Sequence, residues 1–309
     1  MNAIEVKGLK RSYGKFEALK GIDFTVEKGS IFGFLGPNGA GKTTTLMVLT
    51  GLLRVNTGHI TVLGLDPITQ GDTLRSKIGC LLEDSGLYDH LTVQQNLQFY
   101  GRAQLLEEVN LKVRISETLD FFELSEVANK KASKLSRGMR QKTALARAML
   151  TLPDILFLDE PTANLDPQAS VAFRELILEL SRKHGMTIFL NTHRLDEAQR
   201  VCDKIAVIDN GKLLKTGKIE ELRTSQTCPT IRINSNNITQ KMFTDSLKTL
   251  IKKININGND TTIELLHFED IPKLVRGLVA LGANIYEMRQ EERSLEDIYM
   301  ELVGENHGK

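Results

Sequence analysis

Residues 36–43, GPNGAGKT, follow an apolar run and open a segment of helix-forming residues. They match the phosphate-loop pattern G-x-x-x-x-G-K-[ST], in which glycines let backbone N–H groups surround phosphate oxygens. Lys42 is expected to place its charge at the β- and γ-phosphates, and Thr43 to offer its hydroxyl to Mg²⁺. Residues 30–35 read as a buried strand and residues 44–53 as a helix whose positive N-terminus faces the phosphates. This context predicts that the chain binds a nucleoside triphosphate.

The overall composition is nearly neutral, with 40 basic and 39 acidic residues among 309 and a formal net charge of +1. With this balance, no overall positive electrostatic field attracts the chain to nucleic acid or anionic lipid, so a nucleic-acid partner is disfavoured. Cys80, Cys202 and Cys228 fit reduced cytosolic thiols better than a disulfide framework. The opening residues, MNAIEVKGLK, carry no apolar signal segment, and no apolar run approaches the roughly 18 residues that cross a bilayer. We therefore expect any membrane role to depend on another polypeptide.

The chain is long enough for two domains at roughly 150 residues each. Its first 220 or so residues alternate β-rich runs with helical patterns, which predicts an α/β nucleotide-binding domain. Antiparallel strands are expected at 4–6 and 21–26, core strands at 30–35, 77–82, 154–158, 187–191 and 204–208, and a hairpin turn at 209–212. Apolar residues recur without strand alternation over 93–150, which predicts a mostly helical subdomain at about 85–150.

A polar stretch ending in proline, TSQTCP at 224–229, is interpreted as the linker into a second domain. The predicted domains are therefore 1–223, the nucleotide-binding cassette, and 224–309, an accessory domain. Strands are expected at 230–234, 253–257, 261–267 and 284–288, with helices at 239–251 and 271–281. This βαββαβ order predicts a small α+β ferredoxin-like domain, closed by a helix at 295–303.

The segment 154–160, DILFLDE, is an apolar strand that ends in two carboxylates. A phosphate-loop enzyme needs an Asp that organises Mg²⁺ at this place and a carboxylate that activates water. Asp159 is expected to take the first role and Glu160 the second. If the strand continues, the two side chains point in opposite directions, so each can serve its own partner. The alternative is a pair of solvated acids at the end of a strand.

A second motif, LSRGM at 135–139, lies upstream of this strand, with Ser136 as the expected N-cap of a long helix. A Ser-x-Gly before a helix is by itself an ordinary cap. LSRGM nevertheless resembles the LSGGQ signature of ATP-binding cassette (ABC) ATPases, and it precedes ILFLDE by the interval that this family uses. PTANLD at 161–166 is similar to the D-loop of the family. NTH at 191–193 is similar to its switch histidine, which implies that His193 contacts a γ-phosphate.

The remaining motifs fit the same family with three departures. SYG at 12–14 looks like its adenine-stacking loop, in which Tyr13 offers a π-face; the alternative is an ordinary surface tyrosine. GCLLED at 79–84 occupies the Q-loop position, but Glu83 replaces the expected glutamine. The acid either slows turnover, alters the coupling to Mg²⁺, or is neutral. In the signature, Arg137 replaces a glycine and Met139 a glutamine, while Ser136 and Gly138, the phosphate-contacting positions, are kept.

The resemblance covers about residues 1–220 and implies a P-loop NTPase of the ABC cassette fold. This fold is a mixed-sheet core with antiparallel β and helical subdomains. It implies ATP and Mg²⁺ as cofactors, catalytic residues Lys42, Glu160 and His193, and metal contacts from Thr43, Glu83 and Asp159. The implied nucleotide-binding residues are Tyr13, Gly36, Pro37, Asn38, Gly39, Ala40, Gly41, Lys42, Thr43, Thr44, Glu83, Ser136, Arg137, Gly138, Asp159 and Asp166.

Signature residues of this family act on ATP held by the opposite cassette, so a chain with one phosphate loop and one signature needs a partner. A homodimer or a paired cassette meets this need. HRLDEA at 193–198 and SLEDIYMELV at 294–303 resemble cassettes of bacterial drug, antibiotic or sodium exporters. The resemblance implies a peripheral ATPase on the cytoplasmic face of a bacterial membrane. It would drive export of a drug, antibiotic, ion or lipid-like substrate through separate integral-membrane permease subunits.

Three other functions remain as alternatives. An importer cassette is disfavoured because its C-terminal domain would more often be a β-barrel, whereas residues 271–281 show helical periodicity. A regulatory module would use the C-terminal domain to sense a ligand. A soluble ABC protein acting on ribosomes or DNA is the least favoured, because such members carry two cassettes or insert long coiled coils.

Contact with the permease is expected from residues 84–100. This segment carries Leu87, Tyr88, Leu91 and Val93 as candidate exposed apolar side chains. The alternative is that these side chains pack inside the helical subdomain.

Overall fold

The computed structural model describes residues 1–224, 228–291 and 294–307. The chain forms two compact units, Met1–Ile219 joined by the chain's end from Tyr299, and Glu220–Ile298. The sequence-based division differs in two respects: it placed the boundary after residue 223, and it assigned the whole C-terminal end to the second domain.

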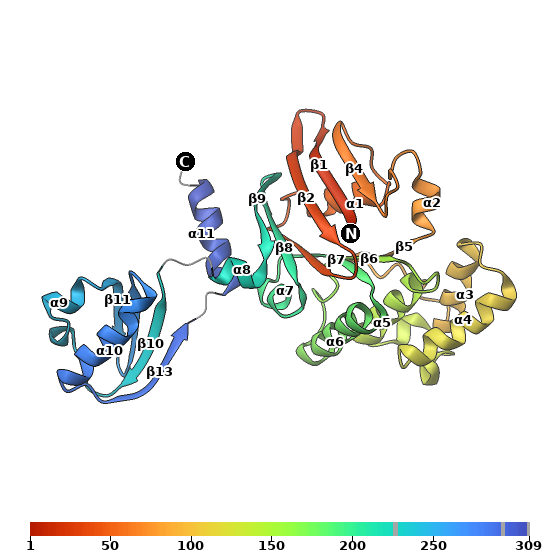
Figure 1. The fold of residues 1–309 in the computed structure, drawn as a ribbon. Helices are drawn as coiled ribbons and strands as arrows, with labels where there is room; N and C mark the ends of the chain where they lie inside the picture. The colour runs from red at the N-terminus through yellow and green to blue at the C-terminus, as the bar shows by residue number, and fades with distance from the viewer. Residues whose placement is uncertain (225–227, 292–293, 308–309) are drawn as a thin grey trace. The chain divides into compact units, whose positions relative to one another are not determined.

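The first unit is built on a six-stranded sheet of order β5-β6-β7-β3-β8-β9 (Figure 1). The strands are β3 (Ile31–Leu35), β5 (Ile78–Leu81), β6 (Ile155–Asp159), β7 (Thr187–Thr192), β8 (Lys204–Asp209) and β9 (Lys212–Lys218). All pairs are parallel except β8 with β9. Every residue of β3, β6 and β7 is buried, as expected for parallel strands covered on both faces. The predicted core strands and the hairpin turn are confirmed; Asn210 and Gly211 have φ of 47° and 76°.

A second, antiparallel sheet of order β2-β1-β4 contains β1 (Asn2–Tyr13), β2 (Phe16–Glu27) and β4 (Thr57–Val62). The two predicted antiparallel strands are confirmed and are longer than expected. Strand β4 was not predicted, because Ile60 and Val62 are its only buried residues and give too short an alternation. Helix α1 (Lys42–Leu49) contacts strands of both sheets and so lies between them. Phe24 from β2 stacks on Phe32 from β3 in this core.

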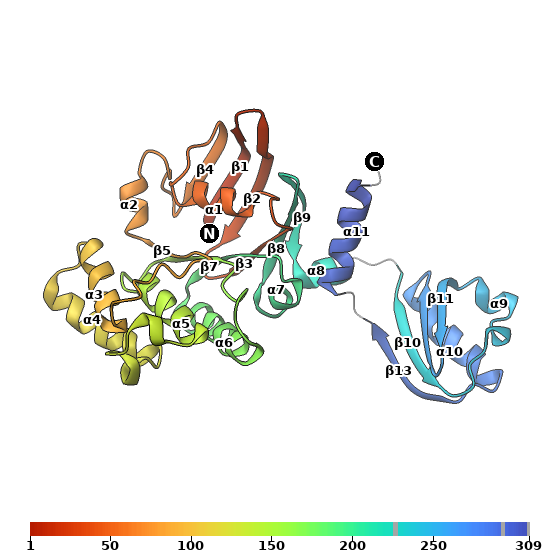
Figure 2. The ribbon, with the colours of Figure 1, turned by 180° about the vertical axis from the view of Figure 1, so that it is seen from behind.

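Helices α5 (Arg137–Ala148), α6 (Pro167–His184) and α7 (Leu195–Val201) cover the other face of the six-stranded sheet (Figures 1 and 2). Helices α3 (Val93–Ala103) and α4 (Glu108–Phe121), with short turns η1 (Ser125–Val127) and η2 (Ala132–Lys134), occupy the predicted helical stretch beside α5. A capping box of Thr92 and Gln95 starts α3. Helix α2 (Gly71–Arg75) also belongs to the first unit, and the residues of α8 (Ile219–Thr224) and α11 (Leu295–His307) are divided between the two units.

The second unit contains a four-stranded antiparallel sheet of order β11-β12-β10-β13. Its strands are β10 (Thr230–Ser235), β11 (Ile251–Asn257), β12 (Asp260–Leu265) and β13 (Ile285–Glu291), and helix α10 (Ile271–Ala280) crosses between β12 and β13 after the short turn η4 (Phe268–Asp270). This strand order is that of the predicted ferredoxin-like fold.

The helix predicted at 239–251 is wrong. This segment forms the turn η3 (Gln240–Met242) and the four-residue helix α9 (Asp245–Lys248), and β11 already begins at Ile251. Thr239 has an extended backbone at the start of this segment, and the extended backbone of Thr244 interrupts the helix. The apolar side chains of this stretch, Phe243 and Leu247, pack into the core of the second unit without a longer helix.

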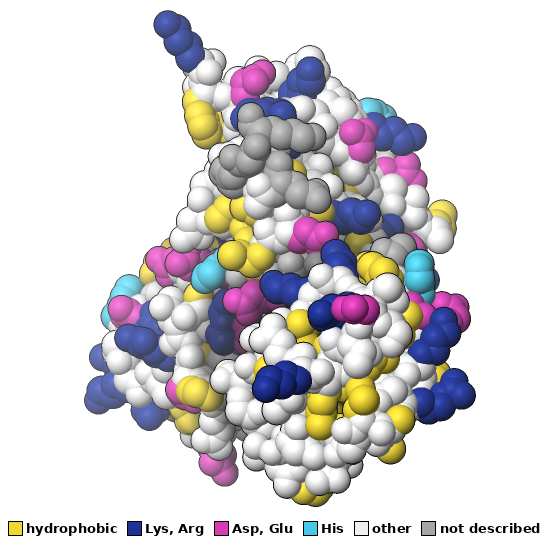
Figure 3. All heavy atoms as spheres, turned by 90° about the vertical axis from the view of Figure 1, so that its left-hand side faces the viewer, with side chains coloured by type: hydrophobic (Ala, Val, Ile, Leu, Met, Phe, Trp, Pro, Cys, Tyr) yellow, Lys and Arg dark blue, Asp and Glu magenta, His cyan; other side chains and the backbone are white. Residues whose placement is uncertain are grey.

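Basic and acidic side chains are interspersed on the face drawn in Figure 3, in keeping with the net charge of +1. None of the helices in the described ranges is long and apolar enough to span a membrane.

Candidate nucleotide-binding site

The phosphate loop joins β3 to α1, and its backbone requires glycine. Gly39 and Gly41 have φ of 82° and 111°, which side chains rarely tolerate. A Cβ on Gly36 would lie 2.2 Å from the carbonyl oxygen of Ile208. The Lys42 side chain folds back over the loop, and its Nζ donates to the carbonyl oxygens of Gly36 at 2.7 Å and Pro37 at 3.2 Å. The loop is therefore shaped with its lysine already in place.

Asp159 ends β6 beside the phosphate loop. Thr43 Oγ1 donates to its Oδ2 and Asn191 Nδ2 to its Oδ1, both at 3.2 Å. Burial raises the pKa of the Asp159 carboxyl, while the hydrogen bonds from Asn191 and Thr43 oppose that rise. A hydroxyl and a carboxylate side by side next to a phosphate site are the oxygen ligands that Mg²⁺ prefers. The residues present therefore fit a magnesium ion.

We expect Asp159→Asn to raise the thermal stability of the nucleotide-free chain at pH 7 by about 2–4 °C. Because its folded pKa is raised above the ordinary value of 3.8, the Asp159 carboxyl stabilises the fold below that value. This stabilisation is lost as pH rises through the folded pKa, because the buried Asp159 carboxyl then becomes charged. Thermal unfolding from pH 4 to pH 7, without Mg²⁺, should show the gain from Asp159→Asn shrinking as pH falls. A gain that is constant with pH would contradict this assignment.

Glu160 has a left-handed backbone with φ of 48°. The strand ends at Asp159, so the side chains of Asp159 and Glu160 do not alternate as they would in a continuing strand. The left-handed turn sets the direction of the Glu160 side chain instead. Its Oε1 lies 2.8 Å from His193 Nδ1 and 3.5 Å from Lys42 Nζ, and its Oε2 accepts from Thr192 at 3.1 Å. A non-glycine residue in this region costs about 1–3 kcal/mol and is typical of functional sites. The carboxylate is thus held between the phosphate-loop lysine and the predicted switch histidine.

Lys42, Asp159 and Glu160 line one cavity of about 410 Å³, to which residues far apart in the sequence contribute, whereas His193 is not part of its lining. Two of its residues, Phe16 and Ala18, were not predicted. The Phe16 side chain is 64% exposed, and it follows Tyr13 by three residues at the start of β2. A second exposed aromatic beside Tyr13 was the available signal. The full lining is Tyr13, Phe16, Ala18, Asn38, Gly39, Gly41, Lys42, Thr43, Thr44, Glu83, Asp159 and Glu160.

The signature lies outside this cavity. Ser136 is the N-cap of α5, as predicted, and its Oγ accepts from the backbone N–H of Met139 at 3.3 Å. Ser136 and Arg137 are exposed, and Arg137 lines a separate cavity of about 410 Å³ together with Glu83 and Glu160. Asp166 caps α6 by accepting from Ala169 at 2.8 Å. One chain therefore does not bring its signature to its own phosphate loop.

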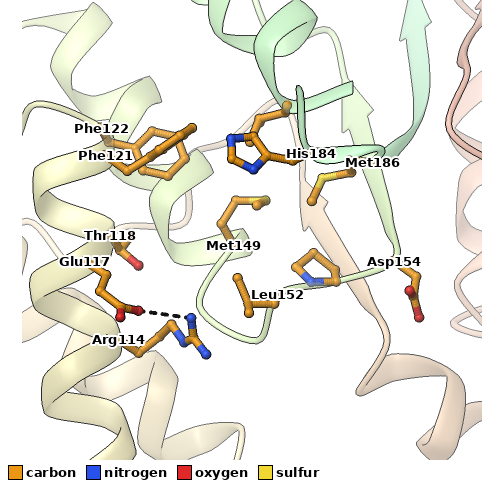
Figure 4. Close-up of a pocket in the computed structure, with 12 residues that line it drawn as sticks. Arg114, Glu117, Thr118, Phe121, Phe122, Met149, Leu152, Asp154, His184 and Met186 are labelled. Atoms are coloured by element: carbon orange, nitrogen blue, oxygen red, sulfur yellow. Dashed lines mark hydrogen bonds and ion pairs between the residues drawn. The ribbon is translucent and has the colours of Figure 1, made fainter. Parts of the chain in front are cut away.

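Another cavity, of about 540 Å³, lies elsewhere and contains none of the predicted site residues. Figure 4 shows Phe121, Phe122 and His184 near Met149, with Arg114 paired to Glu117 along α4. Its lining is mainly apolar. The candidate nucleotide site is therefore distinguished by its side-chain chemistry and not by its volume.

The segment predicted to contact a permease is a loop that leads into α3. Tyr88 is exposed, whereas Val93 is fully buried, so the expectation of an exposed Val93 is wrong. Phe99 of α3 is also exposed, and its ring centroid is 4.7 Å from that of Tyr88. The buried Asn96 holds the loop, because it accepts from the N–H of Tyr88 at 2.8 Å and donates to the carbonyl oxygen of Tyr88 at 3.1 Å. Sequence reasoning missed both Phe99 and Asn96.

Comparison with known proteins also indicates an ATP-binding cassette. The family model described as ABC transporter matches residues 19–163. The model described as the C-terminal domain of DrrA1-3-like ATP-binding proteins matches residues 217–303. The uncharacterized ABC transporter ATP-binding protein YcbN of Bacillus subtilis is 33% identical over 98% of this chain and 97% of its own length. The daunorubicin resistance ATP-binding protein DrrA3 of Streptomyces coeruleorubidus is 32% identical over 98% of this chain and 96% of its own length.

Two solved structures are similar in fold. The structure of cbiO1 from Clostridium perfringens, part of the ABC transporter complex cbiONQ, matches with a TM-score of 0.67 and 29% identity over 72% of this chain and 91% of its own. The dimeric structure of MJ0796, a bacterial ABC transporter cassette, matches with a TM-score of 0.62 and 27% identity over 70% of this chain and 98% of its own. The chain belongs to the ABC transporter ATP-binding proteins, a family that binds ATP and hydrolyses it to drive transport.

Proposed function

We propose that this chain powers a bacterial exporter, by closing as a dimer on ATP and Mg²⁺ at the cytoplasmic face of the membrane and moving separate permease subunits. The observation that carries this proposal is the convergence of Lys42, Thr43, Asp159 and Glu160 in one cavity, with the signature outside it. The names of relatives support export: DrrA3 is a daunorubicin resistance protein, and another is a Nod factor export protein. The transported substrate is thus proposed to be a drug-like, antibiotic, ionic or lipid-like molecule.

In the proposed site, Lys42 turns from the loop carbonyls to the β- and γ-phosphates of ATP, while N–H groups of residues 36–44 surround the phosphate oxygens. Thr43 and Asp159 would hold Mg²⁺, and Glu83 lines the same cavity. When bound, the ion would offset the negative charge that develops during phosphoryl transfer. Tyr13, with Phe16 beside it, offers a surface on which adenine stacks.

Glu160 is proposed to orient and deprotonate the attacking water. Its carboxylate is held by Thr192 and approached by His193, so it has a defined direction toward the phosphate loop. His193 is proposed to contact the γ-phosphate from the same side. Lys42 Nζ lies 3.5 Å from Glu160 Oε1, so the proposed base is next to the group that binds the phosphates.

The second half of the site is proposed to come from another cassette. Ser136 and Gly138 sit at the start of α5, whose twelve residues direct the positive end of a helix dipole outward. In a two-fold dimer, this helix end meets the γ-phosphate held by the other chain. The dimeric cassette MJ0796 supports this arrangement by similarity. The same geometry suits a homodimer or a pair of different cassettes.

Replacing Leu87 and Tyr88 together with aspartate should lower transport at least tenfold while ATP binding remains. Tyr88 presents an exposed ring on a loop that Asn96 fixes, so it is suited to transmit force to a permease. Transport is measured in cells that also express a candidate integral-membrane permease. Replacing Leu105, which is 90% exposed at the end of α3, with aspartate is the matched control and should leave transport unchanged. Normal export by the double variant would place the permease contact elsewhere.

A further inference from the structure

Strand β13 forms an open edge of the sheet in the second unit (Figure 1). Within the described part of the chain it pairs with β10 alone, and residues 286–290 are all exposed. The side chains of Tyr286 and Met288 are 66% and 43% exposed. Such an edge presents unpaired N–H and C=O groups, which template the addition of another strand.

The opposite edge, β11, is protected in a way that β13 is not. It carries the consecutive lysines Lys252 and Lys253, and Lys252 pairs with Glu264 at 2.7 Å. Lysines on an edge strand discourage pairing with another strand. The two edges of this sheet therefore differ in their readiness to accept a partner.

Of the charged side chains of β13, Glu291 contacts Arg232, whereas Glu287 and Arg289 have no ion-pair partner within the described part of the chain. Arg289 lies directly opposite Arg232 of β10, an arrangement that is unfavourable for like charges. Arg232 is already held by Asp260 at 2.7 Å and Glu291 at 3.8 Å. Among described residues, neither Arg289 nor Glu287 forms an ion pair. The strand therefore offers two opposite charges, two residues apart on the same face of the sheet.

We propose that β13 pairs antiparallel with β13 of a second copy, about a two-fold axis at Met288. In this register, Glu287 of each chain lies opposite Arg289 of the other, which makes two symmetric ion pairs. On the other face of the sheet, Met288 meets Met288, and Tyr286 meets Gln290. Side chains that are directly opposite come within about 4.5–5.5 Å at Cβ, close enough for these contacts.

The charges select this register over its neighbours. A two-fold axis perpendicular to the sheet keeps both helix layers on one side, so residues directly opposite must belong to the same face. An axis at Arg289 would place Arg289 opposite itself and Glu287 opposite Glu291. An axis at Glu287 would place two glutamates opposite each other. Like charges in these positions are destabilising, so the axis at Met288 is favoured over these two registers. An axis at Gln290 would instead place Arg289 opposite Glu291, which already contacts Arg232.

Disulfide trapping tests the proposal in the full-length chain without nucleotide, so its outcome is independent of the cassette dimer. Cys80 and Cys228, which are partly exposed, are first replaced by serine, while the buried Cys202 is kept. Met288→Cys should then form an intermolecular disulfide under mild oxidation at least tenfold faster than Asn255→Cys. The latter is an exposed control on the β11 edge.

Charge reversal tests the register. In the Met288→Cys background, Glu287→Arg or Arg289→Glu should each slow trapping about tenfold, because both ion pairs become repulsive. The double reversal should restore the rate. An equal mixture of the two single-reversal chains should also trap rapidly, because every opposing pair in the mixed dimer again has opposite charges.

Two outcomes would overturn the proposal. One is trapping of Met288→Cys no faster than Asn255→Cys. The other is trapping that is fast but insensitive to charge reversal, which would indicate random collision. Because Glu287 and Arg289 are exposed, their reversal is not expected to unfold the chain, and thermal unfolding of each variant checks this.

Discussion

Replacing Glu160 with glutamine is expected to lower ATP turnover by about 10²–10⁴-fold, the range for loss of a general base. Glutamine has nearly the same shape and can keep the hydrogen bond from Thr192, but it cannot accept a proton from water. The carboxylate lies 3.5 Å from Lys42 Nζ, so it is already next to the group that binds the phosphates. Steady-state phosphate release measures the loss.

Nucleotide binding should survive this change, because the phosphate loop and Asp159 are untouched. Glu160→Gln should bind ATP with an affinity close to that of the unchanged chain, and its thermal unfolding should differ little. Asp84→Asn, an exposed acid next to Glu83, is the matched control and should retain turnover. Turnover within a few-fold of normal in Glu160→Gln would remove this residue from the role of base.

Replacing Ser136 with aspartate should reduce turnover about 100-fold or more, through a different mechanism. Aspartate is as good an N-cap as serine, so α5 should stay intact. It nevertheless places a carboxylate where the γ-phosphate held by the other chain is proposed to lie. The aspartate carboxylate and the γ-phosphate would repel each other strongly in a closed site from which water is excluded. Closure of the dimer should therefore fail.

The neutral cap Ser136→Asn separates charge from capping. It should lower turnover less than aspartate does, while both variants keep the same unfolding temperature within a few degrees. Binding of ATP to the isolated chain should be unchanged in both, because Ser136 does not line the phosphate-loop cavity. Weakened ATP binding by monomeric Ser136→Asp would mean that the signature serves its own chain.

Local motifs predicted the site because each is a short segment with a required backbone. The phosphate loop needs glycines at fixed positions. The apolar run before Asp159 predicts a buried parallel strand that ends at this residue. Both predictions describe single segments, and the fold then brings Thr43 within 3.2 Å of Asp159 across 116 residues. The strand order of the C-terminal sheet also followed from element order alone.

Other features depend on tertiary packing and had no clear local signal. The left-handed turn of Glu160 is set by the end of β6, and a continuing strand would have been the simpler expectation. Asn96 looked like one polar residue of a helix, although it is fully buried and fastens the loop before it. The segment at 239–251 has enough apolar residues for a helix, but the extended backbone of Thr244 divides it.

The central claim is that two chains share each ATP. Light scattering of Glu160→Gln, whose mass from sequence is close to 34.5 kDa per chain, tests it directly. In a Glu287→Arg background, which opposes β13 pairing, we expect a monomer at micromolar concentration without nucleotide and a dimer with ATP, and a monomer again with ATP when Ser136→Asp is added. A chain that binds ATP and stays monomeric, or a dimer that ignores Ser136→Asp, would contradict the shared site.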